Sequence, residues 1–402
     1  MKYAIILCDG MADYKIDSLG GKTPMSAAEK PYMDMLAAKS VCGMAQHVPA
    51  HMVPESDTAN LSVMGYDPAV YSKGRSPLEA MSMGLSMSPD DTAFRNNFVT
   101  LTEGGKYEDK TILDHSSGEI STEEADELIK AMNEAFADDS RHWYTGVSYR
   151  HCLLWKDCPG EYNFNRPHDI LGKRIGDYLP KGEVGDVYRE LMEKSFEVLD
   201  NHPVNVKRRA EGKNPGNSIW LWSPGKKPAL PQFYDKFGKK MAVICAVDLI
   251  KGIGRCAGAD VISVEGATGN FRTNYKGKGD AAINALKNGS DLVYVHIEAP
   301  DESGHGANLE EKIKSIELID KHILGPVYEY LKASGEDFKI MVSPDHPTPI
   351  SVRSHTHEEV PFLIYSSKKE VSGIELFDEE NAAKTGLVFE RGHEMMEKFI
   401  EE

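Results

Sequence analysis

Three carboxylates and three imidazoles stand at or beside the ends of short apolar runs, where they could hold metal ions. They are Asp9, Asp301, His305, Asp345, His346 and His355. Asp301 and His305 are four residues apart, so on one helical turn they face the same side and can share one ion. Asp345 and His346 lie between two prolines, on a loop where both side chains can turn inward.

This set of ligands suits Mn²⁺, Zn²⁺ or similar ions better than Ca²⁺, which prefers oxygen alone. Two such ions about 4 Å apart can clamp the attacking and leaving oxygens of a phosphoryl transfer. The pattern therefore predicts a two-metal phosphoryl-transfer site.

Ser56 is the candidate nucleophile of that site. It lies in the segment 53–60, which is followed by residues 61–64, and this stretch predicts a loop and then a helix. A Ser-Asp pair in this place is commonly just a helix N-cap. Beside a cation, however, the hydroxyl can ionise and attack phosphorus, and backbone N–H groups can hold the resulting phosphoserine. The spacing alone leaves both interpretations open.

Composition limits the classes of protein to consider. The chain has 402 residues, 41% hydrophobic residues and a net charge of −17, as in a soluble protein that does not bind nucleic acid. It has no run of about 18 apolar residues, so no membrane span is expected. The apolar run 3–8 is too short for a signal peptide and is typical of a buried first strand. Six scattered cysteines suit reduced thiols in a cytoplasmic enzyme.

Apolar strand-like runs recur at residues 3–8, 292–297, 340–342 and 360–365, with helical patterns between them. This alternation predicts an α/β fold with a mainly parallel sheet sandwiched by helices. Ligands of such sheets gather at the carboxyl ends of the strands, which is where these acidic and imidazole residues fall.

The alternation of strand-like and helical patterns becomes less regular between residues 83 and 227, where Pro, Gly, Asn and aromatic residues are more frequent. We interpret this segment as an inserted, smaller α+β cap domain that contributes to substrate binding. Residues 1–82 and 228–402 are then the two parts of one metal-binding core. Within the insertion, residues 121–136 predict an amphipathic helix that begins at a Ser-x-x-Glu capping box.

A small anionic substrate needs local positive charge in a chain this acidic. Arg150 could grip a phosphate or carboxylate with its two-pronged guanidinium, and Lys251 with a point charge. His151, His168 and Asp169 are further candidates for substrate contact in the predicted cap domain.

Nine short motifs, spread over the whole chain, resemble those of the archaeal-type cofactor-independent phosphoglycerate mutases, a family of the alkaline phosphatase superfamily. The motifs are CDGM (8–11), GGKTP (20–24), ESDTAN (55–60), GYDP (65–68), GRSPLEA (74–80), AVDLIKG (246–252), EGATG (265–269), APDESGH (299–305) and DH (345–346). The resemblance implies an alkaline-phosphatase-like core with an inserted domain, two divalent ions and a serine nucleophile.

Carried over to this chain, the resemblance gives each residue a role. Asp9, Ser56, Asp345 and His346 would hold one ion, and Asp301, His305 and His355 the other. Ser56 would take the phosphoryl group from one hydroxyl of phosphoglycerate and return it to the other. Mn²⁺ is the expected ion, with Mg²⁺, Zn²⁺ or Co²⁺ as alternatives, and no 2,3-bisphosphoglycerate would be needed.

Two departures from the mutase pattern leave an alternative substrate open. Asn60 stands where these mutases usually have a histidine, and Pro347 stands where they often have a serine. Together with GRSPLEA (74–80) and NSIWLW (217–222), these features resemble more closely a bacterial branch of the family proposed to phosphorylate homoserine. Homoserine kinase is therefore the alternative function, with the same metal site.

Two other classes fit less well. The segment GIGRCAG (252–258) has GxGxxxG spacing rather than the dinucleotide-binding GxGxxG, and no clear acidic partner follows it, which argues against an NAD-dependent oxidoreductase. A scaffold with purely structural metal ions would explain the ligands but not a serine beside them.

Overall fold

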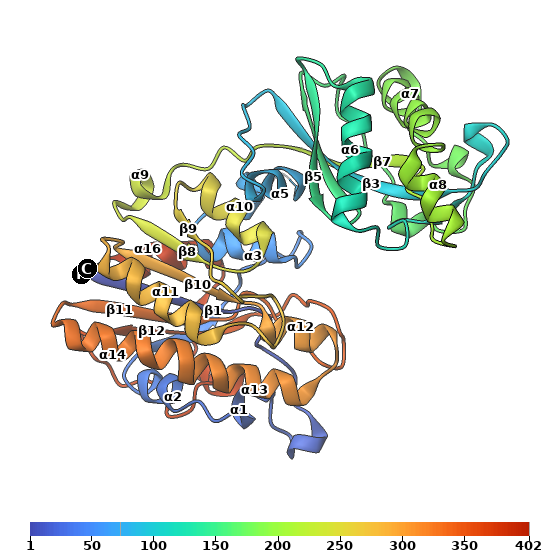
Figure 1. Ribbon diagram of the computed structural model, residues 1–402. Helices are drawn as coiled ribbons and strands as arrows, with labels where there is room; N and C mark the ends of the chain where they lie inside the picture. Colours follow the sequence, from blue (N-terminus) through green and yellow to red (C-terminus); the bar gives the residue numbers. More distant parts are fainter. Residues whose placement is uncertain (73, 402) are drawn as a thin grey trace. The chain divides into compact units, whose positions relative to one another are not determined.

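The computed structural model describes residues 1–72 and 74–401, and the chain divides into two compact units (Figure 1). The core unit comprises residues 1–72 and 229–402, and the inserted unit residues 73–228. This division places helix α5 (Ser76–Ser82) in the inserted unit, where it packs on that unit's sheet, whereas the sequence-based boundary follows residue 82.

The core unit is built on an eight-stranded sheet, and the predicted mainly parallel α/β architecture is confirmed. Only β12 runs antiparallel to its neighbours. The strand order is β13 (Val388–Phe389), β2 (Val41–Ala45), β12 (Val360–Ser366), β11 (Phe338–Ser343), β1 (Lys2–Cys8), β10 (Leu292–Ile297), β8 (Met241–Ile244) and β9 (Asp260–Ile262).

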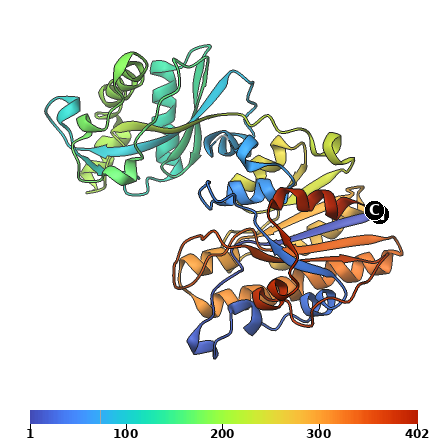
Figure 2. The same ribbon diagram turned by 180° about the vertical axis from the view of Figure 1, so that it is seen from behind.

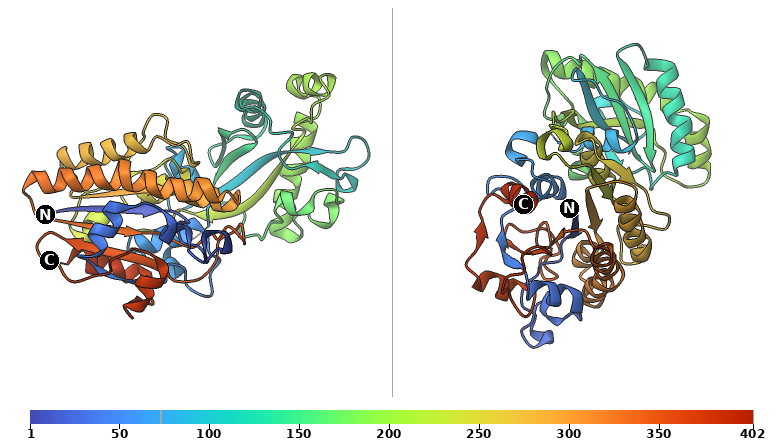
Figure 3. Two further views of the ribbon diagram at one scale, coloured as in Figure 1. Left: turned by 90° about the horizontal axis from the view of Figure 1, so that it is seen from below. Right: turned by 90° about the vertical axis from the view of Figure 1, so that its left-hand side faces the viewer.

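Helices cover both faces of this sheet (Figure 3), which explains why β1 is apolar along nearly its whole length. Ala4, Ile6 and Cys8 join the apolar cluster that includes α11 (Tyr275–Lys287), α13 (Leu309–Ile319) and α14 (Gly325–Ser334). Tyr3 points to the other face, where its ring lies 5.5 Å from that of Phe399 in α16 (Met395–Ile400).

The central strands end at the same edge of the sheet. Cys8 of β1 is in register with Ile297 of β10, and Leu7 with Ser343 of β11. The segments after these strands therefore emerge side by side, at the end of the sheet opposite the N-terminus (Figure 1). Helix α12 (Ala299–His305), with Pro300 in its first turn, follows β10 there.

The inserted unit contains an antiparallel sheet, as expected for an α+β domain (Figure 2). Its long central strand β3 (Asp91–Leu101) pairs with β6 (Arg150–Lys156) on one side and β7 (Ser218–Lys226) on the other. Strand β4 (Ile112–Asp114) pairs antiparallel with the last two residues of β3, Thr100 and Leu101, and β5 (Arg141–Val147) pairs with β6.

Helices α6 (Thr122–Phe136), α7 (Gly182–Leu199) and α8 (Pro203–Ala210) complete the inserted unit. The predicted helix is confirmed in α6, whose first turn is capped by the Ser121 side chain. The remaining helices belong to the core unit: α1 (Pro24–Ala27), α2 (Pro31–Ala37), α3 (Ser56–Val63), α4 (Pro68–Tyr71), α9 (Phe233–Phe237), α10 (Asp248–Cys256) and α15 (Glu379–Lys384). None of the described helices is long and apolar enough to cross a membrane.

Candidate active site

The seven residues predicted to bind metal all lie at the carboxyl end of the core sheet. Asp9 follows β1, Asp345 and His346 follow β11, and Asp301 and His305 belong to α12. His355 is in the loop before β12, and Ser56 is the first residue of α3. The register of β1, β10 and β11 thus brings together the residues that follow these three strands, and Ser56 joins them through its contact with His346.

Asp9, Asp345 and His346 form one group of ligand atoms, all within 4.8 Å of one another. Their side chains are almost completely buried, with exposures of 0%, 1% and 1%. His346 Nε2 lies 3.5 Å from a carboxylate oxygen of each aspartate. Ser56 Oγ lies 3.3 Å from the same nitrogen, so the candidate nucleophile adjoins this group.

Asp301, His305 and His355 form a second group beside the first. Asp301 Oδ2 is 3.3 Å from His305 Nε2, and Asp301 Oδ1 is 3.3 Å from His355 Nε2. The two imidazole Nε2 atoms are themselves 2.9 Å apart. His346 and His355 stack with ring centroids 3.9 Å apart, which joins the two groups.

The donor set and its burial fit two divalent cations. Both carboxylate oxygens of Asp9 are buried without a hydrogen-bond partner, an arrangement that is costly unless a cation compensates it. Burial, followed by repulsion from Asp345 and Asp301, raises the pKa of Asp9 well above its ordinary value. The site therefore has a deficit of positive charge that bound ions would remove.

Each of the three imidazoles is held by its other nitrogen, which leaves Nε2 facing the cluster. His305 Nδ1 is 3.1 Å from the Arg353 carbonyl oxygen, and His355 Nδ1 is 2.6 Å from that of Pro54. His346 Nδ1 is 3.3 Å from Thr348 Oγ1. Such second contacts fix the ring orientation of metal-binding histidines.

Asp301 contacts both imidazoles of the second group, and its carboxylate is the ionised form. Burial alone would raise its pKa, but hydrogen bonds from His305 and His355 bring the pKa well below its ordinary value. In turn, Asp301 raises the pKa of His305 to about 9. A cation bound here would have to replace the proton on His305.

The structure also brings in residues that the sequence analysis did not include in the site. Glu298 offers a carboxylate oxygen within 4.8 Å of Asp9 and Asp301, and burial, followed by repulsion from Asp301, raises its pKa to about 8. His296 Nε2 lies 3.0 Å from Asp9 Oδ2. The signal for His296 was an imidazole inside the otherwise apolar run 292–297.

The candidate substrate residues belong to both units. Lys251 belongs to α10 of the core unit and pairs with Asp248 at 3.1 Å. Arg150, His168 and Asp169 are exposed on the inserted unit. The Arg150 guanidinium lies over the Tyr149 ring, 5.3 Å from its centroid.

His151 occupies a different environment from the other candidates. It is 4% exposed, and its ring packs 4.9 Å from that of Phe98. Its Nδ1 accepts a hydrogen bond from the Gly146 N–H, and burial lowers its pKa to about 3. A buried, neutral imidazole is poorly suited to gripping an anion, so this position is better explained by packing.

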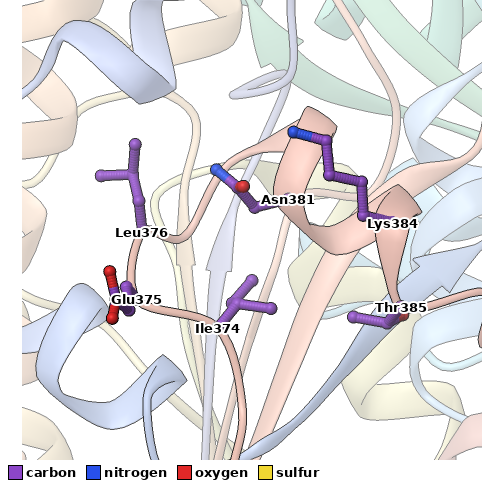
Figure 4. A pocket seen from close by; sticks show the side chains of 6 residues that line it. All are labelled: Ile374, Glu375, Leu376, Asn381, Lys384 and Thr385. Atoms are coloured by element: carbon purple, nitrogen blue, oxygen red, sulfur yellow. The ribbon is translucent and has the colours of Figure 1, made fainter.

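A shallow hollow of about 420 Å³ lies elsewhere on the core unit, at α15 and the segment before it (Figure 4). It is lined by Ile374, Glu375, Leu376, Asn381, Lys384 and Thr385. The ammonium group of Lys384 pairs with Glu380 at 2.7 Å. This is an ordinary mixed surface, without the buried charge that distinguishes the candidate metal-binding cluster.

Comparison with known proteins identifies the family. A family model described as 2,3-bisphosphoglycerate-independent phosphoglycerate mutase matches residues 37–205. A protein of that name from Methanosarcina barkeri is 50% identical to this chain over 96% of both chains. The chain belongs to this mutase family. A relative from Geobacter sulfurreducens, named as a probable mutase of the same kind, is 48% identical over the whole of both chains.

Solved structures of similar proteins support the fold over the full length. A protein of Pyrococcus horikoshii matches with a TM-score of 0.82 and 30% identity, covering 99% of this chain and 96% of its own. The cofactor-independent phosphoglycerate mutase of Thermoplasma acidophilum matches with a TM-score of 0.72 and 28% identity, covering 100% and 99%. Mutases of this family are isomerases, and these names favour the mutase over the homoserine-phosphorylating alternative.

Proposed function

We propose that this chain carries out the mutase reaction, the interconversion of 3-phosphoglycerate and 2-phosphoglycerate, by passing the phosphoryl group through Ser56. The observation that carries this proposal is the position of Ser56 Oγ, 3.3 Å from His346 Nε2 at the edge of two adjoining ligand groups. If these groups hold divalent cations, the cations would favour ionisation of the adjacent Ser56 hydroxyl, which makes it a suitable nucleophile.

In this proposal the ligand groups hold two divalent ions, with Mn²⁺ as the first choice and Mg²⁺, Zn²⁺ or Co²⁺ as alternatives. Asp9, Asp345 and His346, with Ser56, would hold one. Asp301, His305 and His355 would hold the other. When bound, the ions supply the positive charge that activates a hydroxyl and stabilises the phosphoryl oxygens during transfer.

Transfer through Ser56 needs no phosphorylated cofactor such as 2,3-bisphosphoglycerate. The Ser56 hydroxyl attacks phosphorus, so the Ser56 Oγ–P bond forms as the bond between phosphorus and the substrate's 3-oxygen breaks, and the proton that Ser56 gives up ends on that 3-oxygen. The 2-hydroxyl of the retained glycerate then attacks the phosphoserine, the Ser56 Oγ–P bond breaks, and the proton of the 2-hydroxyl ends on Ser56 Oγ. The first turn of α3 has no side-chain cap, so its backbone N–H groups can hold phosphoserine oxygens.

Arg150, His168, Asp169 and Lys251 remain candidates for contact with the substrate's carboxylate and hydroxyl groups. The positive charges of Arg150 and Lys251 would act locally against the net charge of −17, which repels anions at long range. We place the activity in the cytoplasm, where the thiols of the six cysteines would stay reduced.

The test is to incubate the purified, Mn²⁺-loaded protein with 3-phosphoglycerate and to follow 2-phosphoglycerate, without added bisphosphoglycerate. We expect isomerisation that is abolished by a chelator, restored by Mn²⁺ and lost in Ser56→Ala. Homoserine with ATP is run in parallel. Homoserine phosphorylation without isomerisation would overturn the proposed reaction and move this chain to the alternative branch.

A further inference from the structure

Asn60 lies beneath the cluster with every polar atom of its side chain engaged. Its Nδ2 donates to the Ser56 carbonyl oxygen at 2.8 Å and to Asp345 Oδ2 at 2.8 Å. Its Oδ1 accepts from the Tyr294 hydroxyl at 2.6 Å. Asn60 and Tyr294 are both completely buried, so water cannot substitute for these contacts.

The three contacts allow only one orientation of the amide. The Ser56 carbonyl and the Asp345 carboxylate both accept hydrogen bonds, so they require the two N–H bonds of Nδ2. A flipped amide would point Oδ1 at these two acceptors and lose both hydrogen bonds. The Ser56 carbonyl and the Asp345 carboxylate therefore select the orientation, and the Tyr294 hydroxyl holds it by donating to Oδ1.

Asn60 also completes the restraint on Asp345. The N–H groups of Gly10 and His346 donate to Asp345 Oδ1 at 3.2 and 3.0 Å. The Asn60 amide holds the other oxygen, Oδ2. Asp345 is thus held by donors from three segments, and the Asn60 amide joins it directly to the backbone of the residue that carries the candidate nucleophile.

We propose that Asn60 is a positioning residue that sets the place of Ser56 relative to Asp345, and that Tyr294 supports it by donating a hydrogen bond to its Oδ1. The inference rests on the proposed roles of Ser56 and Asp345, and it adds the residue that determines their relative position. An amide is suited to this task because it offers two donors and one acceptor without a charge. A neutral imidazole, with a single N–H, could not serve both Ser56 and Asp345.

The test compares Tyr294→Phe, Asn60→Leu and the double variant with the unchanged protein. Tyr275→Phe is the matched control, because the Tyr275 hydroxyl is buried but has no hydrogen-bond partner. The readouts are kcat and KM for 3-phosphoglycerate, the Kd for Mn²⁺ of the metal-stripped protein, and thermal unfolding without metal. The Kd requires no substrate, so it is independent of the reaction assigned to the chain.

Loss of a group that orients a metal ligand typically weakens metal affinity or activity about 10–100-fold, and we expect this for Asn60→Leu. KM should stay within about twofold, because ground-state substrate binding is untouched. Tyr294→Phe should show the same pattern with a smaller effect. The double variant should be no worse than Asn60→Leu, because Tyr294 acts only through Asn60.

Normal kcat and Mn²⁺ affinity in a folded Asn60→Leu would overturn the inference. So would effects of the two substitutions that multiply in the double variant, or a loss in Tyr294→Phe that Tyr275→Phe reproduces. If Asn60→Leu does not fold, Tyr294→Phe carries the test alone, and its activity and Mn²⁺ affinity must both fall. An unchanged protein that is inactive on 3-phosphoglycerate would instead contradict the proposed function.

Discussion

The core unit and the inserted unit each build a sheet covered by helices, but they place their polar residues differently. In the core unit β1, β10 and β11 run parallel, so the segments that follow them meet at one edge and bring Asp9, Asp301 and Asp345 together. In the inserted unit the strands are antiparallel, so successive loops alternate between the two ends. Strand direction thus determines which unit concentrates its charge.

Two buried histidines, one in each unit, also differ in the residues that surround them. His346 and His151 are 1% and 4% exposed, and burial lowers the pKa of both. His346 lies among two aspartates, a serine and another imidazole. His151 packs on a phenylalanine, in a unit whose core contains Phe94, Trp155 and Tyr188. Burial of a histidine therefore indicates a functional site only together with the charges around it.

The strongest prediction concerns Ser56. Replacing the nucleophile of a covalent mechanism removes the reaction path, so Ser56→Ala should lower kcat by about 1,000-fold or more. Ser62→Ala, on the same helix, is the control and should keep most of the activity. The measurement is the steady-state rate of 2-phosphoglycerate formation. Comparable activity in the two variants would remove Ser56 from the mechanism.

Thr348 offers a direct comparison of the two units. Its hydroxyl donates to Asp301 Oδ1 at 2.5 Å and lies 3.3 Å from His346 Nδ1. Thr348→Val should therefore weaken Mn²⁺ binding about 10-fold or more. Thr100→Val removes a similarly buried hydroxyl contact, to the Pro215 carbonyl in the inserted unit, and should leave Mn²⁺ binding unchanged. Equal Mn²⁺ affinities, measured by equilibrium dialysis, would contradict the contrast.

Metal affinity should depend on pH through the core unit's cluster. Asp301 raises the pKa of His305 to about 9, so below that pH a bound ion must displace a proton. The affinity for Mn²⁺ should therefore increase with pH, by up to about tenfold per unit for one proton released, and level off near pH 9. Titrations between pH 6.5 and 9 measure this. An affinity that falls as the pH rises would contradict the prediction.

The smallest effect is expected in the inserted unit. His151→Leu replaces a buried, neutral ring whose Nδ1 accepts a hydrogen bond from Gly146, so the free energy of unfolding should fall by about 1–2 kcal/mol. Mn²⁺ affinity and KM should not change. Urea unfolding and substrate kinetics check these outcomes. A large increase in KM with unchanged stability would restore His151 as a substrate contact.

Much of the metal cluster could be predicted because its signal is local. A charged residue directly after an apolar run, as at Asp9 and Asp345, indicates the carboxyl end of a buried strand. The four-residue spacing of Asp301 and His305 is realised on α12, and their side chains lie 3.3 Å apart. The proximity of the six ligand residues follows from these local patterns and the parallel sheet.

What could not be predicted depends on register and on contacts between distant segments. The role of Asn60 appears only when Tyr294 and Asp345 are brought to it by β10 and β11. The burial of His151 depends on which face of β6 turns toward Phe98, which a Pro- and Gly-rich segment does not reveal. Helix α5 was assigned to the core because its packing against β3 and β7 has no local signal.

The most direct test of the two-metal account is anomalous X-ray diffraction from crystals of the Mn²⁺-loaded protein. The account predicts two manganese peaks, one contacting Asp9, Asp345 and His346 and the other contacting Asp301, His305 and His355, with Ser56 Oγ beside the first. A single ion, or manganese bound elsewhere while these carboxylates remain without metal, would contradict it.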